Sequence, residues 1–298
     1  MAATIEIGIV TDENRPDLTD SDRLLLCELR ERGHRVEPVV WTDEEAEWKA
    51  KDLLVVRSCY EYYTRPEAFR AWIDRMESLD VVVANPPSVL RWNMHKFYLR
   101  DLIDAGVDVL PTAFIEQGTD VELGTLLRKR GWEEAVVKPA IATSSAGAWK
   151  TSLEVARGDR QHFEADLATG DRLVQEFAPE IADGERSLVF LDESFSHAWL
   201  SVPASDEYRS HHRFGGSTTA YDPPDTIVEE ATSVLEVARE VLQIEVRLPY
   251  ARVDGIERNG HFSLMELELL EPYLGLGRSN EAATRLADAL ERYPETSF

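Results

Sequence analysis

The sequence predicts a doubly wound parallel α/β unit at its start and an α+β unit after it. Over roughly the first 85 residues, short β-rich runs alternate with helical ones, a pattern typical of a parallel sheet. The run Asn85-Pro86-Pro87 breaks this alternation. From Ser187 onward the strands are longer and only two helices interrupt them, which is typical of an α+β arrangement.

The first unit should contain four strands and two helices. Residues 5–10 form an apolar strand, and an acidic turn leads into a helix at 20–32 that ends at Gly33. The other expected elements are strands at 36–41, 53–57 and 80–84 and a helix at 66–76. Neither GxGxxG after the first strand nor GxxxxGK[ST] is present, so neither a dinucleotide fingerprint nor a P-loop is expected.

The rest of the chain divides into two further predicted domains. We expect helices at 89–105, 121–130, 159–168, 226–242 and 279–293, and strands at 109–115, 135–138, 172–177, 187–191, 195–203, 248–253 and 262–269. The change of pattern places domain boundaries after residues 86 and 178. The predicted domains are therefore 1–86, which is Rossmann-like, 87–178 and 179–298.

The composition excludes several classes of partner. The net charge of −24 would repel nucleic acid and anionic membranes. No apolar run reaches the roughly 18 residues that span a bilayer, and the N-terminus does not resemble a signal peptide. Cys27 and Cys59 are too few for a disulfide framework, which fits a reducing compartment. We expect a cytoplasmic protein; whether its acidity reflects a high-salt source stays open.

A lysine at the end of an apolar strand is the first feature that predicts chemistry. Lys138 ends the run Ala-Val-Val-Lys, and the small-residue loop 140–147 follows it. A buried ammonium group needs a partner, and small residues let backbone N–H groups approach an anion closely. The pattern indicates a phosphate clamp. The alternative is a lysine that reaches solvent before an ordinary loop.

Two glutamates two residues apart form the second feature. Glu266 and Glu268 point to the same face of a strand, where their charges repel unless a cation neutralises them. Oxygen-only ligands favour Mg²⁺. Asp254 would add a third carboxylate if the strands 248–253 and 262–269 form a hairpin. The alternative is a solvated acidic strand face.

The third feature is a strand that runs into a proline-containing segment. Residues 173–177 lead into Ala178-Pro179, where unpaired backbone groups can imitate a base pair against adenine. Glu185 follows closely and could hold ribose hydroxyls. Alone, this feature is weak, because any strand exit offers free backbone groups.

In this order, the three features resemble the ATP-grasp superfamily, and more closely its glutathione-synthetase-like branch. That branch carries a terminal E-x-N strand with a proline three residues after the Asn. Here Glu266-Leu267-Glu268 with Pro272 matches at an offset, and Glu268 replaces the Asn. The segments 57–62, 91–96, 195–198 and 250–255 resemble a bacterial subgroup that includes the cyclo-ligase forming cycloserine from an O-ureido-serine precursor.

The resemblance implies an ATP-grasp fold with an N-terminal pre-ATP-grasp domain, and it implies site roles. Arg209 and Lys138 would act in catalysis, Arg209 by steadying the transferring phosphoryl group. Glu268 adds a charge to the metal site, and one glycine in the phosphate loop makes that loop stiffer than usual. ATP would contact Lys96, Lys138, Thr143, Ser144, Ser145, Gly147, Gln175, Glu176, Phe177, Ala178 and Glu185, and one or two Mg²⁺ ions would bind Asp254, Glu266 and Glu268.

Arg57 and Tyr62 are the candidate substrate residues, because they follow a strand end in the first domain, where open α/β sheets bind ligands. Interdomain packing is the alternative. The implied activity is that of an ADP-forming carboxylate–amine ligase acting on an amino acid or small peptide. A regulatory protein that binds a nucleotide without ligase activity is the rival interpretation. The substrates and the choice between linear ligation and ring closure stay open; a homodimer is common among similar enzymes.

Overall fold

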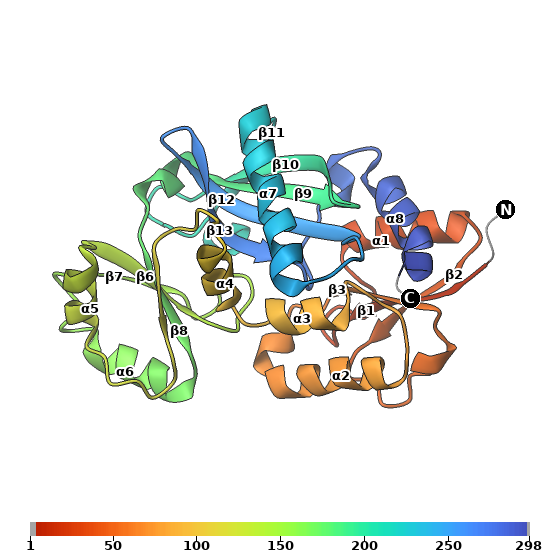
Figure 1. Ribbon diagram of the computed structural model, residues 1–298, viewed down its shortest axis with the longest axis horizontal. Helices are drawn as coiled ribbons and strands as arrows, with labels where there is room; N and C mark the ends of the chain where they lie inside the picture. Colours follow the sequence, from red (N-terminus) through yellow and green to blue (C-terminus); the bar gives the residue numbers. More distant parts are fainter. Residues whose placement is uncertain (1–3, 297–298) are drawn as a thin grey trace.

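The computed structural model describes residues 4–296, which form three β-sheets with helices packed on them (Figure 1). The first sheet has the order β2-β1-β3-β4, and all its pairs are parallel. This confirms the predicted parallel sheet. Its elements are β1 (Glu6–Thr11), α1 (Asp20–Glu31), β2 (Arg35–Val40), β3 (Leu53–Ser58), α2 (Pro66–Ser78) and β4 (Val83–Ala84).

Local sequence explains the helices of this unit. The Thr19 side chain accepts a hydrogen bond from the Asp22 backbone N–H and so caps α1. Leu25 and Leu29 lie four residues apart on the buried face of α1. Pro66 stands at the first position of α2, where its missing N–H costs no hydrogen bond.

The second sheet has the order β5-β8-β6-β7 and is antiparallel. The strand β7 was not predicted, because its four residues are mostly polar and follow the loop after Lys138 without an apolar alternation. The elements are β5 (Thr112–Ile115), α5 (Leu123–Arg130), β6 (Glu134–Pro139), β7 (Trp149–Ser152), α6 (Arg160–Thr169) and β8 (Arg172–Glu176).

The third sheet has the order β11-β10-β9-β12-β13 and is also antiparallel. The predicted hairpin of its last two strands is present. The edge strand β11 was missed because its polar residues are mainly exposed. The elements are β9 (Glu185–Leu191), β10 (Ser194–Val202), β11 (Ser217–Tyr221), α7 (Asp225–Leu242), β12 (Tyr250–Arg258), β13 (His261–Glu268) and α8 (Ala282–Thr296).

The single helix predicted at 89–105 is wrong. The structure has two helices there, α3 (Pro87–Asn93) and α4 (Tyr98–Asp104). The Asn93 carboxamide binds the Leu269 N–H at 2.7 Å, which ties the end of α3 to the segment after β13. The backbone N–H of Lys96 bonds the Ala140 carbonyl at 2.8 Å instead of continuing a helix. The break therefore places Lys96 beside the loop that follows β6.

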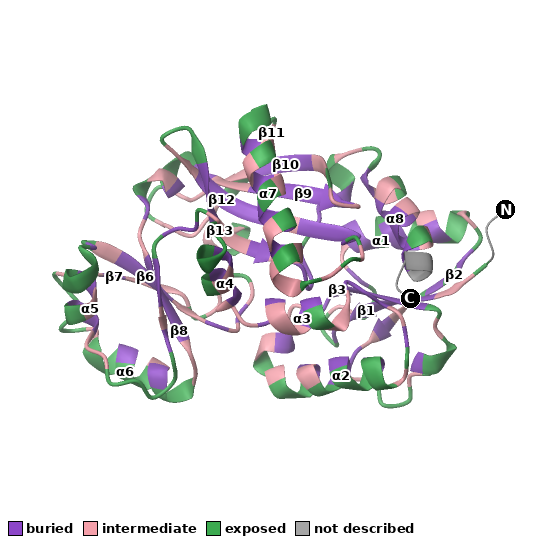
Figure 2. Cartoon of the chain, in the orientation of Figure 1, coloured by how far each residue is buried: buried purple, intermediate pink, exposed green. Residues whose placement is uncertain are grey.

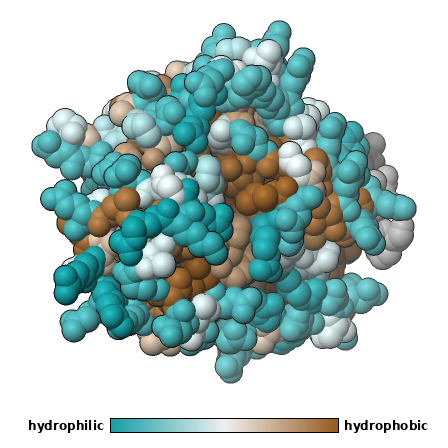
Figure 3. Space-filling view, turned by 60° about the vertical axis from the view of Figure 1, so that its left-hand side comes forward, coloured by the Kyte–Doolittle hydropathy of each residue, from teal (hydrophilic) through white to brown (hydrophobic). Residues whose placement is uncertain are grey.

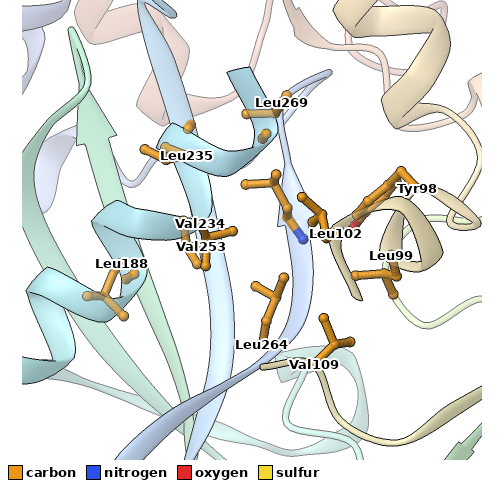
Figure 4. Packing of buried hydrophobic residues seen from close by; sticks show 14 of the residues in the cluster. Tyr98, Leu99, Leu102, Val109, Leu188, Val234, Leu235, Val253, Leu264 and Leu269 are labelled. Carbon is orange, nitrogen blue, oxygen red and sulfur yellow. Dashed lines mark hydrogen bonds between the residues drawn. The ribbon is translucent and has the colours of Figure 1, made fainter. Parts of the chain in front are cut away.

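The main core lies between the third sheet and the helices α4 and α7. Figure 4 shows Leu102 of α4 and Leu235 of α7 packed toward Val253 of β12 and Leu264 of β13. Figure 2 shows these strands as largely buried, whereas the helices keep exposed outer faces. Burying such side chains stabilises the fold by roughly 1.5–3 kcal/mol each.

Contacts from distant parts of the chain join the first sheet to the third. The Tyr250 hydroxyl of β12 lies 2.9 Å from the Val56 carbonyl and 2.8 Å from the Ala84 carbonyl. The C-terminal helix α8 packs against α1, where Arg32 and Asp288 pair at 2.6 Å. The predicted three-domain division stays a prediction, and these contacts show how closely its first and last parts are joined.

The surface is dominated by polar side chains. Figure 3 shows a largely hydrophilic face with several apolar areas between the polar groups. Within residues 4–296, no helix combines the length and the apolar character needed to cross a membrane.

Candidate active site

A cavity lies between the second and third sheets. Its walls include eight of the residues predicted for ATP or catalysis. The apolar walls come from Leu110, Val136, Ile181 and Met265, which sequence reasoning missed because each resembles an ordinary core residue. The eight are Lys138, Ser145, Gln175, Glu176, Phe177, Ala178, Glu185 and Arg209.

Backbone groups at the end of β8 are available to a ligand. The Glu176 N–H bonds the Pro111 carbonyl at 2.8 Å, but Pro111 has no N–H to return a bond to the Glu176 carbonyl. The Phe177 N–H is used by the Glu134 carbonyl at 3.0 Å. No partner of the Ala178 N–H is found among the described residues. The Glu176 carbonyl thus offers an acceptor and the Ala178 N–H offers a donor two residues later. This pair matches the edge of an adenine ring.

Lys138 extends from the end of β6 into this cavity. Its Nζ atom lies 2.7 Å from Oε1 of Gln175. Burial lowers the pKa of Lys138, against the charges of Glu266 and Glu185, which raise it. This half-buried ammonium group has one neutral partner, so it has donors left for an anionic ligand such as a phosphate.

The loop after β6 turns sharply through left-handed backbone. Ser144 and Ser145 have φ angles of 51° and 57°, and Gly147 has 71°. Within the loop, the Ala146 N–H donates to the Thr143 carbonyl at 2.9 Å and the Ala148 N–H donates to the Ser145 carbonyl at 3.3 Å. A Cβ atom at Gly147 would lie 2.9 Å from Cγ of Pro139, so this position favours glycine for space as well as conformation. Only Ser145 of the predicted loop residues lines the cavity.

Two hydrogen bonds hold this loop from opposite sides. The Thr143 hydroxyl donates to the Tyr60 carbonyl of the N-terminal unit at 2.8 Å. The Tyr208 hydroxyl donates to the Ala148 carbonyl at 3.2 Å. Thr143 therefore contacts the first domain and is not among the residues that line the cavity.

Glu185 begins β9 at the cavity wall. The Ser210 hydroxyl donates a hydrogen bond to its carboxylate. Burial, with a further contribution from the charge of Asp254, raises the pKa of Glu185 to about 7. A carboxyl group held in this way could accept hydrogen bonds from ribose hydroxyls.

The hairpin register brings the three predicted metal ligands to one face. Asp254 of β12 stands opposite Glu266 of β13, and Arg252 stands opposite Glu268. Arg252 pairs with Asp254 at 2.9 Å and with Glu268 at 2.6 Å. Sequence reasoning missed Arg252, although it lies two residues before Asp254 and so shares its face of the strand.

Lys96 completes this cluster. Its Nζ atom lies 2.6 Å from Oε1 of Glu266 and 2.8 Å from the Ala142 carbonyl. Burial opposes the charged form, but the charge and hydrogen bond of Glu266 raise the pKa of Lys96 overall. Lys96 therefore joins the phosphate loop to the carboxylate cluster.

The carboxylate cluster fits Mg²⁺ in its chemistry. Its donors are carboxylate oxygens, which magnesium prefers. In residues 4–296, no group of three or more His, Cys, Asp or Glu side chains is arranged to hold a metal ion. Lys96 and Arg252 instead hold Glu266 and Glu268 in ion pairs. Metal binding would thus exchange a protein cation for Mg²⁺ at one or more of these carboxylates.

Arg209 reaches the cavity but is held by neighbours. It pairs with Glu207 at 2.6 Å, and its guanidinium carbon lies 3.5 Å from the Phe214 ring centre. The hydrogen bond from Arg209 lowers the pKa of Glu207 to about 2. A role in phosphoryl transfer would require Arg209 to leave this pair.

The two predicted substrate residues lie in different surroundings. Arg57 is fully buried, and its Nε atom lies 3.1 Å from Asp22. Tyr62 is buried in an aromatic cluster, 5.1 Å from the Phe69 ring centre, and it does not line the cavity. The surroundings of Tyr62 are those of a core residue.

Comparison with known proteins adds to this geometry. The N-terminal domain family of the D-cycloserine synthetase DcsG matches residues 7–85. The cycloserine biosynthesis protein DcsG of Streptomyces lavendulae is 27% identical over 297 residues, which is 96% of each protein. The crystal structure of D-cycloserine synthetase DcsG superposes with a TM-score of 0.89 at 26% identity, over 97% of this chain and 99% of that one.

An ATP-grasp protein of the RimK domain type from Sphaerobacter thermophilus superposes with a TM-score of 0.69 at 18% identity, over 96% of this chain and 99% of that one. The chain has the ATP-grasp fold. A D-alanine–D-alanine ligase from Bacillus anthracis, solved with ATP, gives a TM-score of 0.68 at 16% identity over 98% of both chains. The predicted ATP-grasp fold is confirmed. These relatives also favour the ligase prediction over a regulatory nucleotide-binding protein.

Proposed function

We propose that this ATP-grasp protein is an ADP-forming ligase that phosphorylates an acid group of an amino-acid-derived substrate and then joins it to an amine. The observation that carries this proposal is the cavity lined by Lys138, Gln175 and Glu185, whose wall residue Met265 precedes Glu266 of the carboxylate cluster on β13. Three features follow one another as the parts of a nucleotide site would. The free backbone groups near Ala178 correspond to the base site, the Lys138 ammonium to the phosphate site and the acids of the β12–β13 hairpin to the metal site.

The residues divide the work by position and charge. The β8 exit and Glu185 would hold the nucleoside, while Lys138, Lys96 and the turn at 143–147 would hold the phosphates. When bound by Asp254, Glu266 and Glu268, Mg²⁺ supplies positive charge to the phosphates.

The side chains therefore act by placement and by neutralising charge. The substrate oxygen would attack the γ-phosphorus and release ADP, and an amine would then displace phosphate from the acyl-phosphate-like product. Arg209 and Arg252 are the candidate cations for the developing charge. Each would have to leave its ion pairs, Arg209 with Glu207 and Arg252 with Asp254 and Glu268. No side-chain nucleophile is required.

Ring closure within one substrate is the second candidate. It is supported by the match to the cycloserine biosynthesis protein, which extends over 96% of the chain, whereas a glutathione synthetase of Rhodopseudomonas palustris matches only 50% of it at 26% identity. O-Ureidoserine is therefore the first substrate to test alone, without a second amine.

The experiment is a screen for ADP and phosphate release with Mg-ATP. Free amino acids, O-ureidoserine and pairs of amino acids serve as acceptors, and EDTA serves as the control. We expect release that requires both Mg²⁺ and an acceptor. Nucleotide binding without acceptor-dependent turnover in any mixture would instead support the regulatory alternative.

A further inference from the structure

A buried carboxylate next to the proposed metal site lacks a cationic partner. Glu271 follows the end of β13 and is only 8% exposed. Among the residues whose side chains are described, none forms an ion pair with it. The three predicted metal ligands, by contrast, are all held by Lys96 or Arg252. A buried, unpaired carboxylate is costly, so its presence needs an explanation.

Glu271 lies between the metal site and the N-terminal unit. The Arg57 guanidinium of β3 donates a hydrogen bond to the carbonyl of Pro272, the residue after Glu271, so Glu271 lies beside the N-terminal unit. Burial raises the pKa of Glu271 to about 7, and the charge of Lys96 counteracts this rise. The same N-terminal segment receives the hydrogen bond from Thr143 of the phosphate loop. A molecule bound at Glu271 would thus be next to the site of phosphoryl transfer.

Two donors of the neighbouring N-terminal segment have no hydrogen-bond partner. Arg57 donates hydrogen bonds from Nε to Asp22 and from Nη2 to the Pro272 carbonyl, but its buried Nη1 has no partner. The buried Tyr60 hydroxyl also has no partner. Burial and the charge of Asp22 raise the pKa of this hydroxyl, Arg57 lowers it and Glu271 raises it, so these groups share one electrostatic environment. The Tyr60 side chain as a whole is half-buried, and the guanidinium carbon of Arg15 lies 4.9 Å from the centre of its ring.

We propose that Glu271 determines acceptor specificity by pairing with a protonated amino group of the substrate. Arg57 and Tyr60 complement the carboxylate of the same molecule. The inference rests on the proposed ligase function, because it assigns how that ligase selects an acceptor. An acetylated amine carries no charge, leaves Glu271 unpaired and adds bulk, so the site should reject it.

The test is calorimetric binding to the protein loaded with Mg²⁺ and AMPPNP. The probes are D-alanine, D-serine and O-ureidoserine, each compared with its N-acetyl derivative. The wild-type protein should bind at least one free amino acid about tenfold or more tightly than its acetylated form. Glu271→Gln should weaken the binding of that amino acid by a similar factor and leave AMPPNP affinity unchanged. Glu229→Gln, which removes an exposed charge on α7, is the matched control and should change neither.

Glu271→Asp separates charge from shape, because it keeps the carboxylate on a shorter side chain. It should keep the preference for the free amine even where affinity falls. The proposal is overturned if the wild-type protein binds none of the amino acids or binds both forms equally, if Glu271→Gln keeps the preference, or if Asp and Gln lose it alike. Binding with this preference but without ADP release would contradict the proposed function and leave the role of Glu271 standing.

Discussion

Removing Arg252 should destabilise the metal-free protein strongly, because this residue neutralises two acids. Its guanidinium lies 2.9 Å from Asp254 and 2.6 Å from Glu268, and its side chain is 14% exposed. Breaking a buried ion pair by removing one partner costs about 3–5 kcal/mol. For a chain of this size, each kcal/mol shifts Tm by roughly 2–4 °C, so Arg252→Met should lower Tm by about 6–20 °C in EDTA.

Mg²⁺ provides the decisive comparison for this variant. A divalent cation at Asp254 and Glu268 would replace the missing charge, so Mg²⁺ should raise Tm more in Arg252→Met than in the wild type. Differential scanning calorimetry in EDTA and in Mg²⁺ measures both shifts. Arg247→Gln is the control, because this arginine makes similar pairs on the surface and should cost less than about 1 kcal/mol. An Arg252 variant as stable as that control, with or without Mg²⁺, would refute the reasoning.

Three further predictions concern the nucleotide, the metal and pH. Lys138→Ala should weaken ATP binding by roughly 10–100-fold, measured by calorimetry, because a charge-assisted contact is lost; unchanged affinity would exclude the phosphate clamp. Glu266→Gln should reduce Mg²⁺-dependent turnover by about 100-fold or more, and full activity would remove this acid from the metal site. Glu185 and Glu271 have a pKa of about 7 in the folded protein against 4.5 ordinarily, so the folded form holds their protons longer. The free energy of unfolding should therefore fall as pH rises from about 4.5 to 7. Urea unfolding should show a smaller fall in Glu271→Gln than in the wild type. An equal fall in both proteins would contradict the raised pKa of Glu271.

Strong periodic patterns made most of the fold predictable. The parallel first sheet and the hairpin that pairs Asp254 with Glu266 follow from apolar runs and their lengths. The break in the helix predicted at 89–105 did not, because a distant contact causes it: Asn93 binds the backbone after β13. Short polar strands such as β7 and β11 were missed because tertiary pairing, rather than local preference, forms them.

The candidate site was predicted unevenly for a related reason. Lys138 and the acid pair stand out because charges rarely end or line apolar strands. Arg252 was missed because it was treated apart from Glu268, its partner across the hairpin, and Glu271 was missed because its burial comes from tertiary packing. Tyr62 was placed near a substrate from its position after a strand, whereas its ring lies in the aromatic cluster with Phe69. Burial of this kind cannot be determined from one sequence.

The central claim is that this cavity and the adjoining acids couple ATP cleavage to the activation of an amino-acid-derived acid. Single-turnover formation of ADP, with O-ureidoserine and the amino acid panel as acceptors, tests it most directly. The account predicts ADP formation that needs both Mg²⁺ and acceptor and that is lost in Glu266→Gln. ADP formation at the same rate without acceptor, or unchanged in that variant, would contradict it.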